Sequence, residues 1–295
     1  MPTPALELVL LGTGSPLPSA VRCGAGQVIF AGETRVLVDC GWGASRRLFQ
    51  AGIPLLGIDV ACFTHMHSDH IPDFADFLIM RWISGAKRPL TVFGPEGTAE
   101  TVAGFLAALR RDIGYRIAHH GDKLSADGIR VEVHEVATTA APTEVATIGD
   151  VLIESFEVDH FPVVPAFGYR FSRQGRRLVL SGDTTVCANL KVACEDADLV
   201  VCEAVNTTML NAQIQFIRGG NPTAAALMED IEEYHAPTLE IAAMARDSRV
   251  KQLALSHIIP PVADDGSANA TFLQGMSDIY AGPITLARDL QRFSV

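Results

Sequence analysis

The run His65-Met66-His67-Ser68-Asp69-His70 decides how this chain is interpreted. It places three imidazoles and one carboxylate within six positions, directly after the apolar run from Ile58 to Thr64. Imidazole and carboxylate are the side chains that bind zinc and similar divalent cations at neutral pH. Because alternate residues of an extended strand point the same way, His65 and His67 can be directed at one point. The turn that follows can direct Asp69 and His70 at a second point nearby.

Three further candidate ligands are single residues at the ends of apolar runs. His160 follows the run from Ile153, Asp183 follows Leu178 to Gly182, and His257 follows Gln252 to Ser256. Strand ends are where a sheet presents chemical groups, because the loops there converge on one edge. The repeated placement beside a six-residue cluster predicts that all three contribute to one metal site. The other histidines, His119, His120 and His134, fall outside this pattern and are expected on the surface or in strands.

These motifs resemble those of the metallo-β-lactamase superfamily, in the branch that holds tRNA 3′-processing endonucleases (tRNase Z) and arylsulfatase-like hydrolases. The resemblance covers nearly the whole chain and is specific for the fold and the metal site, but weak for the substrate, because one scaffold carries many chemistries. The stretches that carry it are Leu10-Leu11-Gly12-Thr13-Gly14-Ser15-Pro16, Val38-Asp39-Cys40-Gly41, Thr64 to His70, Asp159-His160, Leu180-Ser181-Gly182-Asp183-Thr184 and Leu253-Ala254-Leu255-Ser256-His257.

The resemblance implies two divalent metal ions per chain, with zinc expected and Mn²⁺ or Fe²⁺ as alternatives. The first ion would be held by His65, His67 and His160, and the second by Asp69, His70 and His257, with Asp183 bridging the two. A metal lowers the pKa of its bound water to about 7, so a metal-bridging hydroxide could attack an ester at neutral pH.

The resemblance also implies a pair of residues that handle protons. The tRNase Z branch has a His-Glu-Ala-Thr motif whose Glu pairs with a downstream His. The matching run here is Val201-Cys202-Glu203-Ala204-Val205, so Cys202 stands for the His and Val205 for the Thr. The downstream histidine matches His235, and such a pair could protonate a leaving oxygen. A structural carboxylate and a helix-end histidine are the alternative interpretation. The expected catalytic residues are therefore Asp69, Glu203 and His235.

Short apolar runs alternate with helical patterns along the chain, beginning with strands at 6–11, 27–30, 36–39 and 60–63. Helical patterns are expected at 44–51, 72–80, 97–110, 222–234 and 239–245. With the resemblance, this order predicts an α/β (α+β) fold, the four-layer αββα metallo-β-lactamase sandwich. We expect residues 1–295 to form a single domain of this fold.

Composition suggests an enzyme of the cytoplasm. No apolar run reaches the roughly 18 residues of a membrane span, and the N-terminus lacks the pattern of a signal peptide. The six cysteines show no Cys-x-x-Cys spacing, and free buried thiols suit a reducing compartment. A net charge of −11 and scattered basic residues argue against a nucleic acid partner. The tRNA-clamping arm of the resembled enzymes has no counterpart insert here. A homodimer is suggested by the resemblance alone.

Apolar residues near the candidate ligands favour a small substrate. Phe161–Phe167, Trp82 and Ile258–Pro261 would line the metal cleft, and Arg81 could meet one anionic group. Ordinary core packing is the alternative. The leading hypothesis is a dinuclear metal-dependent hydrolase of a small-molecule ester, namely a sulfate, phosphodiester, lactone or carboxylic ester. The first alternative is a tRNase Z-type RNA 3′-processing endonuclease. The second is a non-catalytic or redox metal-binding module.

Overall fold

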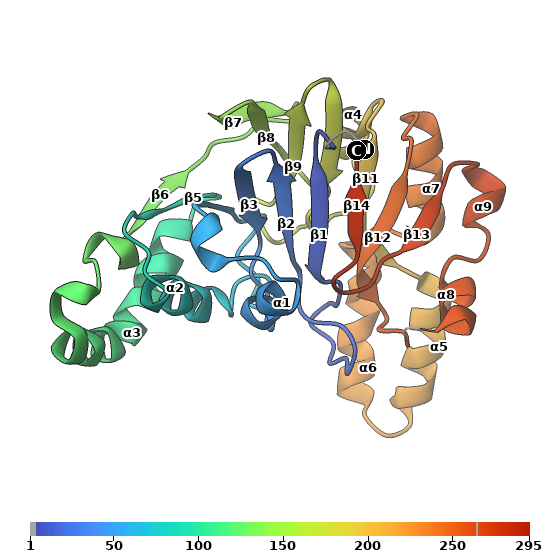
Figure 1. The fold of residues 1–295 in the computed structure, drawn as a ribbon. Coiled ribbons are helices and arrows are strands. Elements are labelled where there is room, and N and C mark those ends of the chain that lie inside the picture. Colours follow the sequence, from blue (N-terminus) through green and yellow to red (C-terminus); the bar gives the residue numbers. More distant parts are fainter. Residues whose placement is uncertain (1–3, 264) are drawn as a thin grey trace.

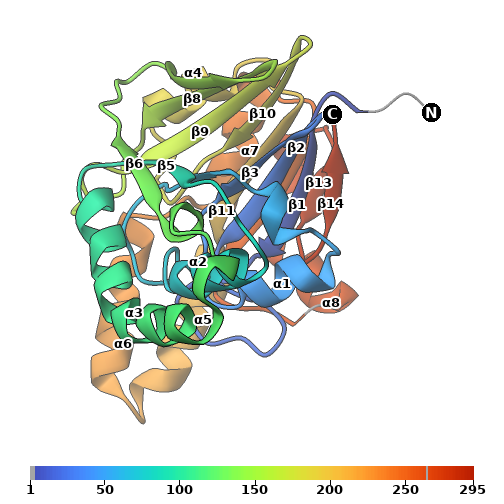
Figure 2. The same ribbon diagram turned by 60° about the vertical axis from the view of Figure 1, so that its left-hand side comes forward.

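Two seven-stranded β-sheets lie face to face in the computed structural model, which describes residues 4–263 and 265–295 (Figures 1 and 2). The first sheet has the order β14-β1-β2-β3-β4-β5-β6 and the second the order β13-β12-β11-β10-β9-β8-β7. Each sheet is mixed. Strands β3 to β6 run parallel to one another, as do β10 to β13, and all other neighbouring pairs are antiparallel.

The strands are short and mostly buried. Those of the first sheet are β1 (Glu7–Gly12), β2 (Gly26–Ala31), β3 (Thr34–Val38), β4 (Val60–Cys62), β5 (Leu90–Gly94), β6 (Val131–Glu135) and β14 (Arg292–Ser294). Those of the second are β7 (Thr143–Ile148), β8 (Val151–Glu157), β9 (Phe167–Arg173), β10 (Arg176–Leu180), β11 (Leu199–Val205), β12 (Leu253–Ile259) and β13 (Ile284–Leu286).

Helices cover the outer face of each sheet. The first sheet is covered by α1 (Ala44–Gln50), α2 (Phe74–Ile83) and α3 (Thr98–His120), and the second by α4 (Ala188–Cys194), α7 (Thr238–Asp247), α8 (Gly266–Phe272) and α9 (Met276–Ile279). A hairpin of α5 (Thr207–Arg218) and α6 (Pro222–Glu229), followed by the 3₁₀ turn η4 (Asp230–Glu233), extends below the sheets in both views (Figures 1 and 2). No helix among residues 4–263 and 265–295 is long and apolar enough to cross a membrane.

The alternation of side chains along each strand explains the four layers. In β1, Leu8 and Leu10 face the core between the sheets, whereas Val9 and Leu11 face the helices of the first sheet. A strand covered on both faces reads as a continuous apolar run, as β1 does. The predicted αββα sandwich is thereby confirmed.

Several elements differ from the sequence expectation. The third helix extends ten residues beyond the predicted end at 110, and the pattern at 222–234 is an α-helix followed by a 3₁₀ turn. Helices α4, α5, α8 and α9 and strands β7, β13 and β14 were not predicted. Leu210 and Ile214 are the two buried residues of α5. They pack in a small cluster of their own, because the hairpin stands away from the main core.

Parallel strands of both sheets bring their carboxyl ends to one edge of the molecule. Asp39 follows β3, the loop from His65 follows β4, and Asp183 follows β10. Glu203 and His257 lie near the ends of β11 and β12. Loops at such an edge converge, so residues more than 200 positions apart in the chain can form one site.

Candidate active site

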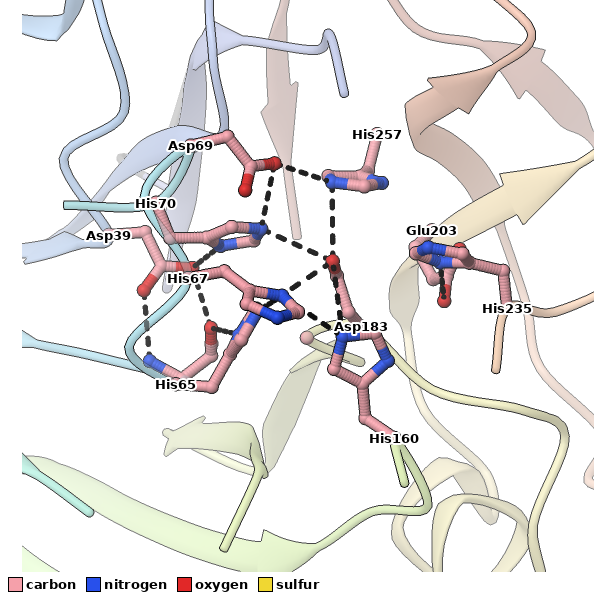
Figure 3. A network of polar contacts seen from close by, with 12 residues as sticks. Asp39, His65, His67, Asp69, His70, His160, Asp183, Glu203, His235 and His257 are labelled. Atoms are coloured by element: carbon pink, nitrogen blue, oxygen red, sulfur yellow. Dashed lines mark hydrogen bonds and ion pairs between the residues drawn. The ribbon is translucent and has the colours of Figure 1, made fainter. Parts of the chain in front are cut away.

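Two groups of candidate metal ligands meet at this edge (Figure 3). In the first, Nε2 of His65 and Nε2 of His160 lie 3.0 and 3.3 Å from Nδ1 of His67. Oδ2 of Asp183 lies 3.8 Å from the His65 nitrogen and 4.0 Å from the His160 nitrogen. Ligands bound tetrahedrally at about 2.0–2.1 Å from one ion are roughly 3.3 Å apart, so these four atoms have a spacing that suits a divalent metal.

The second group lies beside the first and shares Asp183. Nε2 of His257 is 3.1 Å from Oδ2 of Asp69, and Nε2 of His70 is 3.6 Å from the same oxygen. Oδ2 of Asp183 is 3.2 Å from the His257 nitrogen and 3.3 Å from the His70 nitrogen. One carboxylate oxygen therefore faces both groups, and the cluster fits a dinuclear divalent metal site. All seven ligands expected from the sequence are brought together.

Local backbone features direct two of these side chains. His257 is the extra residue of a β-bulge in β12, because Glu203 pairs with Ser256 while Ala204 pairs with Ile258. Its φ of 47° takes it out of the ladder, as bulges beside active sites commonly do. Before Asp183, Gly182 has a φ of 63°, and a Cβ there would lie 2.3 Å from the carbonyl oxygen of Phe167. Only glycine fits this turn.

Asp39 fixes two of the imidazoles from behind. Its Oδ1 accepts from the Thr64 amide at 2.9 Å, and its Oδ2 accepts from the Thr64 hydroxyl at 2.9 Å. Because the Thr64 hydroxyl donates to Asp39, it accepts from Nδ1–H of His65 at 3.1 Å. Nδ1–H of His70 donates directly to Oδ2 of Asp39 at 2.9 Å. Each contact places the proton on Nδ1 and leaves Nε2 with a free lone pair.

His160 is fixed in the same tautomer, because its Nδ1 can only donate to the Tyr234 carbonyl, 3.0 Å away. Nε2 of His70 is buried and makes no well-aligned hydrogen bond among residues 4–263 and 265–295, although Oδ2 of Asp183 lies 3.3 Å away. A metal ion held by both atoms would satisfy this buried nitrogen. These features fit a bound metal ion and were not visible in the sequence, where Asp39 was only part of a motif.

Most ligands have pKa values that suit a metal. Burial, with neighbouring histidines, lowers the pKa of His65, and burial also lowers the pKa of His67 and His160, so these imidazoles are neutral. Burial would raise the pKa of Asp183, but nearby histidines outweigh it and hold the pKa well below its usual range. His70 differs, since Asp183 and Asp39 outweigh burial and raise its pKa well above the usual value. A metal at His70 must displace a proton.

Glu203 and His235 form a buried pair beside the two groups (Figure 3). Nδ1 of His235 lies 2.8 and 2.9 Å from the two carboxyl oxygens of Glu203, and Oε1 also accepts from the Thr184 amide at 2.7 Å. Burial and then Asp183 raise the pKa of Glu203, while burial lowers the pKa of His235. Both shifts favour the uncharged form of each group, so the pair tends to hold its proton within the hydrogen bond rather than as an ion pair.

The replacement at Cys202 leaves this pair intact. Along β11, Cys202 is fully buried among the side chains that pack the second sheet against its helices. Glu203 points to the other face, toward the site. The side chain at position 202 therefore does not enter the pair. One ring nitrogen of His235 lies within 4.8 Å of ligand atoms of Asp183 and His257.

Two residues expected in the cleft lie elsewhere. Arg81 is buried, and it donates to the Ile58 carbonyl at 2.9 Å and to Asp59 at 2.7 Å, at the end of β4 opposite the site. Trp82 is fully buried in α2, and its indole donates to the Ser125 carbonyl. Neither can contact a substrate at the metal ligands, so these expectations are wrong. Phe161–Phe167 also contributes no lining residue to the cavity described below, whereas Ile259 does.

A basic surface along the C-terminal half of α3 was also missed. Arg110 and Arg111 are exposed, have no ion pair in the described part of the chain, and border one hollow with Tyr115. The helix extension and the turn after it add further basic or titratable residues, which are Arg116, His119, His120 and Lys123. Arg110 comes 13 residues after Gly97, or about 20 Å along the helix, so this surface lies well away from Gly97, which precedes α3 and lies against Met66 of the ligand loop.

Comparison with known proteins identifies the family. Residues 34–258 match the model of the beta-lactamase superfamily domain. The chain is 37% identical over 292 residues to a protein named ribonuclease Z from Mycobacterium sp. (strain KMS), covering 98% of this chain and 96% of the relative. The chain belongs to the metallo-β-lactamase superfamily, in its tRNase Z branch. As a member of this branch it is a metal-dependent hydrolase of ester bonds.

Solved structures of this superfamily share the fold. The short form of human tRNase Z matches with a TM-score of 0.65 at 20% identity, covering 98% of this chain and 99% of the other. The metallo-β-lactamase fold protein YhfI from Bacillus subtilis matches with a TM-score of 0.71 at 17% identity, covering 98% and 99%. At these identities the likeness concerns the fold alone.

The ribonuclease Z relatives correct two expectations. A second one, from Mycolicibacterium paratuberculosis (strain ATCC BAA-968 / K-10), is 37% identical over 293 residues and covers 98% of both chains. Likeness of this extent overturns the small-molecule ester as the leading substrate, and with it the argument against a nucleic acid partner. A net charge of −11 averages over the whole surface, whereas nucleic acid binding depends on the local distribution of charge, so the net charge does not exclude such a partner.

Proposed function

We propose that the chain is a tRNase Z-type endonuclease, which cleaves an RNA phosphodiester during 3′ processing of precursor tRNA. The observation that carries the proposal is the likeness to ribonuclease Z relatives over 98% of the chain, in a protein whose two ligand groups meet on Asp183. A dinuclear centre of this kind can act on the attacking and leaving oxygens of a phosphodiester together.

In this proposal, His65, His67 and His160 would hold one ion and Asp69, His70 and His257 the other, with Asp183, whose Oδ2 faces both groups, as a ligand to each. When bound, the two ions supply Lewis acidity toward the phosphate and toward the attacking water. The protein contributes the fixed tautomers of His65, His70 and His160, which keep Nε2 free. It also excludes water from the ligands, of which all but His67 are buried.

Glu203 and His235 supply the proton in this proposal. The leaving ribose oxygen must gain a proton, and a buried, hydrogen-bonded Glu203–His235 pair can donate one through the ring of His235. His235 lies at the wall of the cavity that opens beside the ligands, whereas Glu203 lies behind it. His235 is therefore the donor, and Glu203 positions it and restores its proton.

The C-terminal half of α3 supports an RNA substrate. Arg110 and Arg111 are unpaired within the described residues, and Tyr115 lies beside them, so phosphates and an unstacked base could both be contacted. Figure 1 shows α3 at one side of the molecule and the α5–α6 hairpin at another. A polynucleotide bound at the site could extend toward either element.

The finer assignments are also proposals. Zinc is the expected ion because imidazole and carboxylate ligands suit it, with Mn²⁺ and Fe²⁺ as alternatives. A cytoplasmic compartment is supported by six free cysteines, five of them buried. A single domain over residues 1–295 is supported by the core between the sheets, to which strands from both halves of the chain contribute.

The test compares cleavage of a 3′-extended precursor tRNA by the wild-type protein and two variants at defined metal content. We expect Asp183→Ala to lose both ions and all cleavage, because its oxygen faces both groups, and His257→Ala chiefly to lose one ion. Asp196→Ala, which removes an exposed carboxylate paired with Arg249, is the matched control and should behave as wild type. Wild-type protein that holds two ions but leaves the precursor uncut would contradict the proposal.

A further inference from the structure

A cavity of about 330 Å³ opens directly beside the candidate ligands. His67, Asp183 and His235 form one side of it. The other side is apolar and comes from two distant parts of the chain, the loop after β1 and the segment of α6 and η4. Its volume lies at the small end of the roughly 300–1,000 Å³ typical of ligand pockets. It can therefore hold one compact group next to the reacting atoms.

The apolar wall is braced from behind. Leu210 and Ile214 of α5 pack with Met228 of α6 against Val205 and Ile259 at the ends of β11 and β12. The side chain of Asn206 caps α5 by accepting from the Met209 amide, and it donates to the Phe272 carbonyl. The hairpin is thus anchored to the same strands that carry Glu203 and His257. Leu227 and Ile231 on its inner side then hold a fixed position relative to the ligands.

Ser15 supplies a polar group at this wall. It is 1% exposed, it lines the cavity, and its hydroxyl finds no hydrogen-bond partner among residues 4–263 and 265–295. A buried hydroxyl without a partner is costly, so a ligand edge is the natural completion. Within the described residues no Lys or Arg lines the cavity, which argues against a charged occupant such as a second phosphate.

Tyr234 adds an aromatic surface between the wall and the ligands. Its ring centroid lies 4.8 Å from that of His235 and 5.4 Å from that of His160, and the residue is only partly buried. The exposed part of the ring lines the cavity. Flat aromatic and aliphatic surfaces with one hydroxyl match a group that has apolar faces and a polar edge, which describes a nucleobase.

We propose that this cavity holds the nucleobase adjoining the scissile phosphodiester, with Leu227 and Tyr234 against its faces and the Ser15 hydroxyl bonded to its edge. The inference rests on the proposed endonuclease function. It assigns the α5–α6 hairpin a role in substrate selection, because unstacking one base into the cavity places the neighbouring phosphate at the metal ligands. A base paired in a duplex could not enter, so cleavage is directed to single-stranded RNA at the end of a stem.

The experiment combines wall variants with an abasic substrate. Precursor RNAs carry a normal or an abasic nucleotide immediately 5′ or 3′ of the scissile bond, and kcat/KM is measured for wild type, Ser15→Ala and Leu227→Asp. Phe216→Asp is the matched control, because Phe216 is 87% exposed on the same hairpin and does not line the cavity. Thermal unfolding of each variant verifies that it is folded.

For wild type we expect the abasic nucleotide at one of the two positions to lower kcat/KM by about 5- to 150-fold. On normal RNA, Ser15→Ala should lose about 2- to 10-fold and Leu227→Asp more, with Phe216→Asp unchanged. On abasic RNA the wall variants should equal wild type, since the interaction is already absent. Equal abasic losses in wild type and variants, or wild-type indifference to both abasic positions, would overturn the base pocket alone. Failure of wild type to cut any precursor would instead overturn the proposed function.

Discussion

Replacing Asp39 with asparagine tests whether the hydrogen bonds behind the histidines set the affinity of the second metal site. The variant keeps the size of the side chain, and asparagine tolerates the φ of 55° found here. Its amide oxygen can still accept from the Thr64 amide. At the position of Oδ2, however, an NH₂ group would face the Thr64 hydroxyl and Nδ1 of His70, both of which now donate to that oxygen.

The conflict is resolved most simply if His70 moves its proton to Nε2, which is the nitrogen that faces Asp69 and Asp183. A protonated Nε2 cannot bind a metal. Loss of such outer contacts typically costs 10- to 100-fold in metal affinity, or about 1.4–2.7 kcal/mol. His65 is affected less, because its contact with Asp39 passes through the Thr64 hydroxyl, which can rotate.

The assay is a competition titration with a chelator of known affinity, which resolves two binding steps per chain. We expect Asp39→Asn to weaken one step by 10- to 100-fold and the other by less than about 5-fold. Asp59→Asn is the control, since Asp59 pairs with Arg81 and Arg88 at the opposite end of β4. If both steps of the Asp39→Asn protein matched wild type within two-fold, the tautomer argument would be refuted.

Three further predictions follow from other contacts. Glu203→Gln should keep both metals but lower kcat on precursor tRNA by about 10²–10⁴-fold. The loss should be smaller on an activated p-nitrophenyl diester, whose leaving group needs no proton. Equal losses on both substrates would indicate a structural role for Glu203. The double variant Arg110→Glu and Arg111→Glu should raise KM for RNA. It should also reduce the slope of log KM against log salt concentration by about 1–2, and an unchanged slope would exclude this surface from binding. Asp198→Asn should lower the free energy of unfolding by about 1–3 kcal/mol at pH 7. Burial tends to raise the pKa of Asp198, but hydrogen bonds from Lys251, the Arg177 amide and Arg176 outweigh burial and lower that pKa. Because the pKa of Asp198 is lowered in the folded state, its contribution to stability is present above about pH 4 and is lost as the pH falls through the folded pKa. The difference in free energy of unfolding between wild type and Asp198→Asn, measured with denaturant, should therefore be smaller at pH 3 than at pH 7.

The candidate ligands could be predicted because their signal is local. His65, His67, Asp69 and His70 lie within six positions, and their chemistry is visible without any knowledge of the fold. His160, Asp183 and His257 stand singly at the ends of apolar runs, which is a weaker signal. That signal becomes useful only beside the cluster from His65 to His70. The sandwich followed from the resemblance and from continuous apolar runs such as β1, which is covered on both faces.

The role of Asp39 depends on contacts that no local pattern reveals. It lies 25 and 31 positions from Thr64 and His70, and many aspartates follow strands without serving as acceptors for a ligand. The bulge at His257 was hidden for the same reason, since the sequence places His257 after the apolar run that ends at Ser256, and nothing local shows that β12 continues to Ile259. Both features arise from pairing between distant strands.

The substrate was misjudged because average properties were used in place of local ones. Arg110 and Arg111 are adjacent in the sequence, and they share one hollow with Tyr115 because α3 continues past residue 110 to His120. Likewise, Trp82 and Arg81 were assigned to the cleft from their position in the chain, whereas α2 directs them into the interior. The α5 helix was missed although Asn206 provides a helix cap before an amphipathic segment.

The measurement that tests the account most directly is cleavage of a 3′-extended precursor tRNA as zinc is added stepwise to metal-free protein. Because Asp183 faces both ligand groups, we expect the rate to rise with added metal and to reach its plateau at two ions per chain, with bound metal counted in the same samples. Full cleavage at one ion per chain or none, or no cleavage of the precursor at two, would contradict a dinuclear RNA endonuclease.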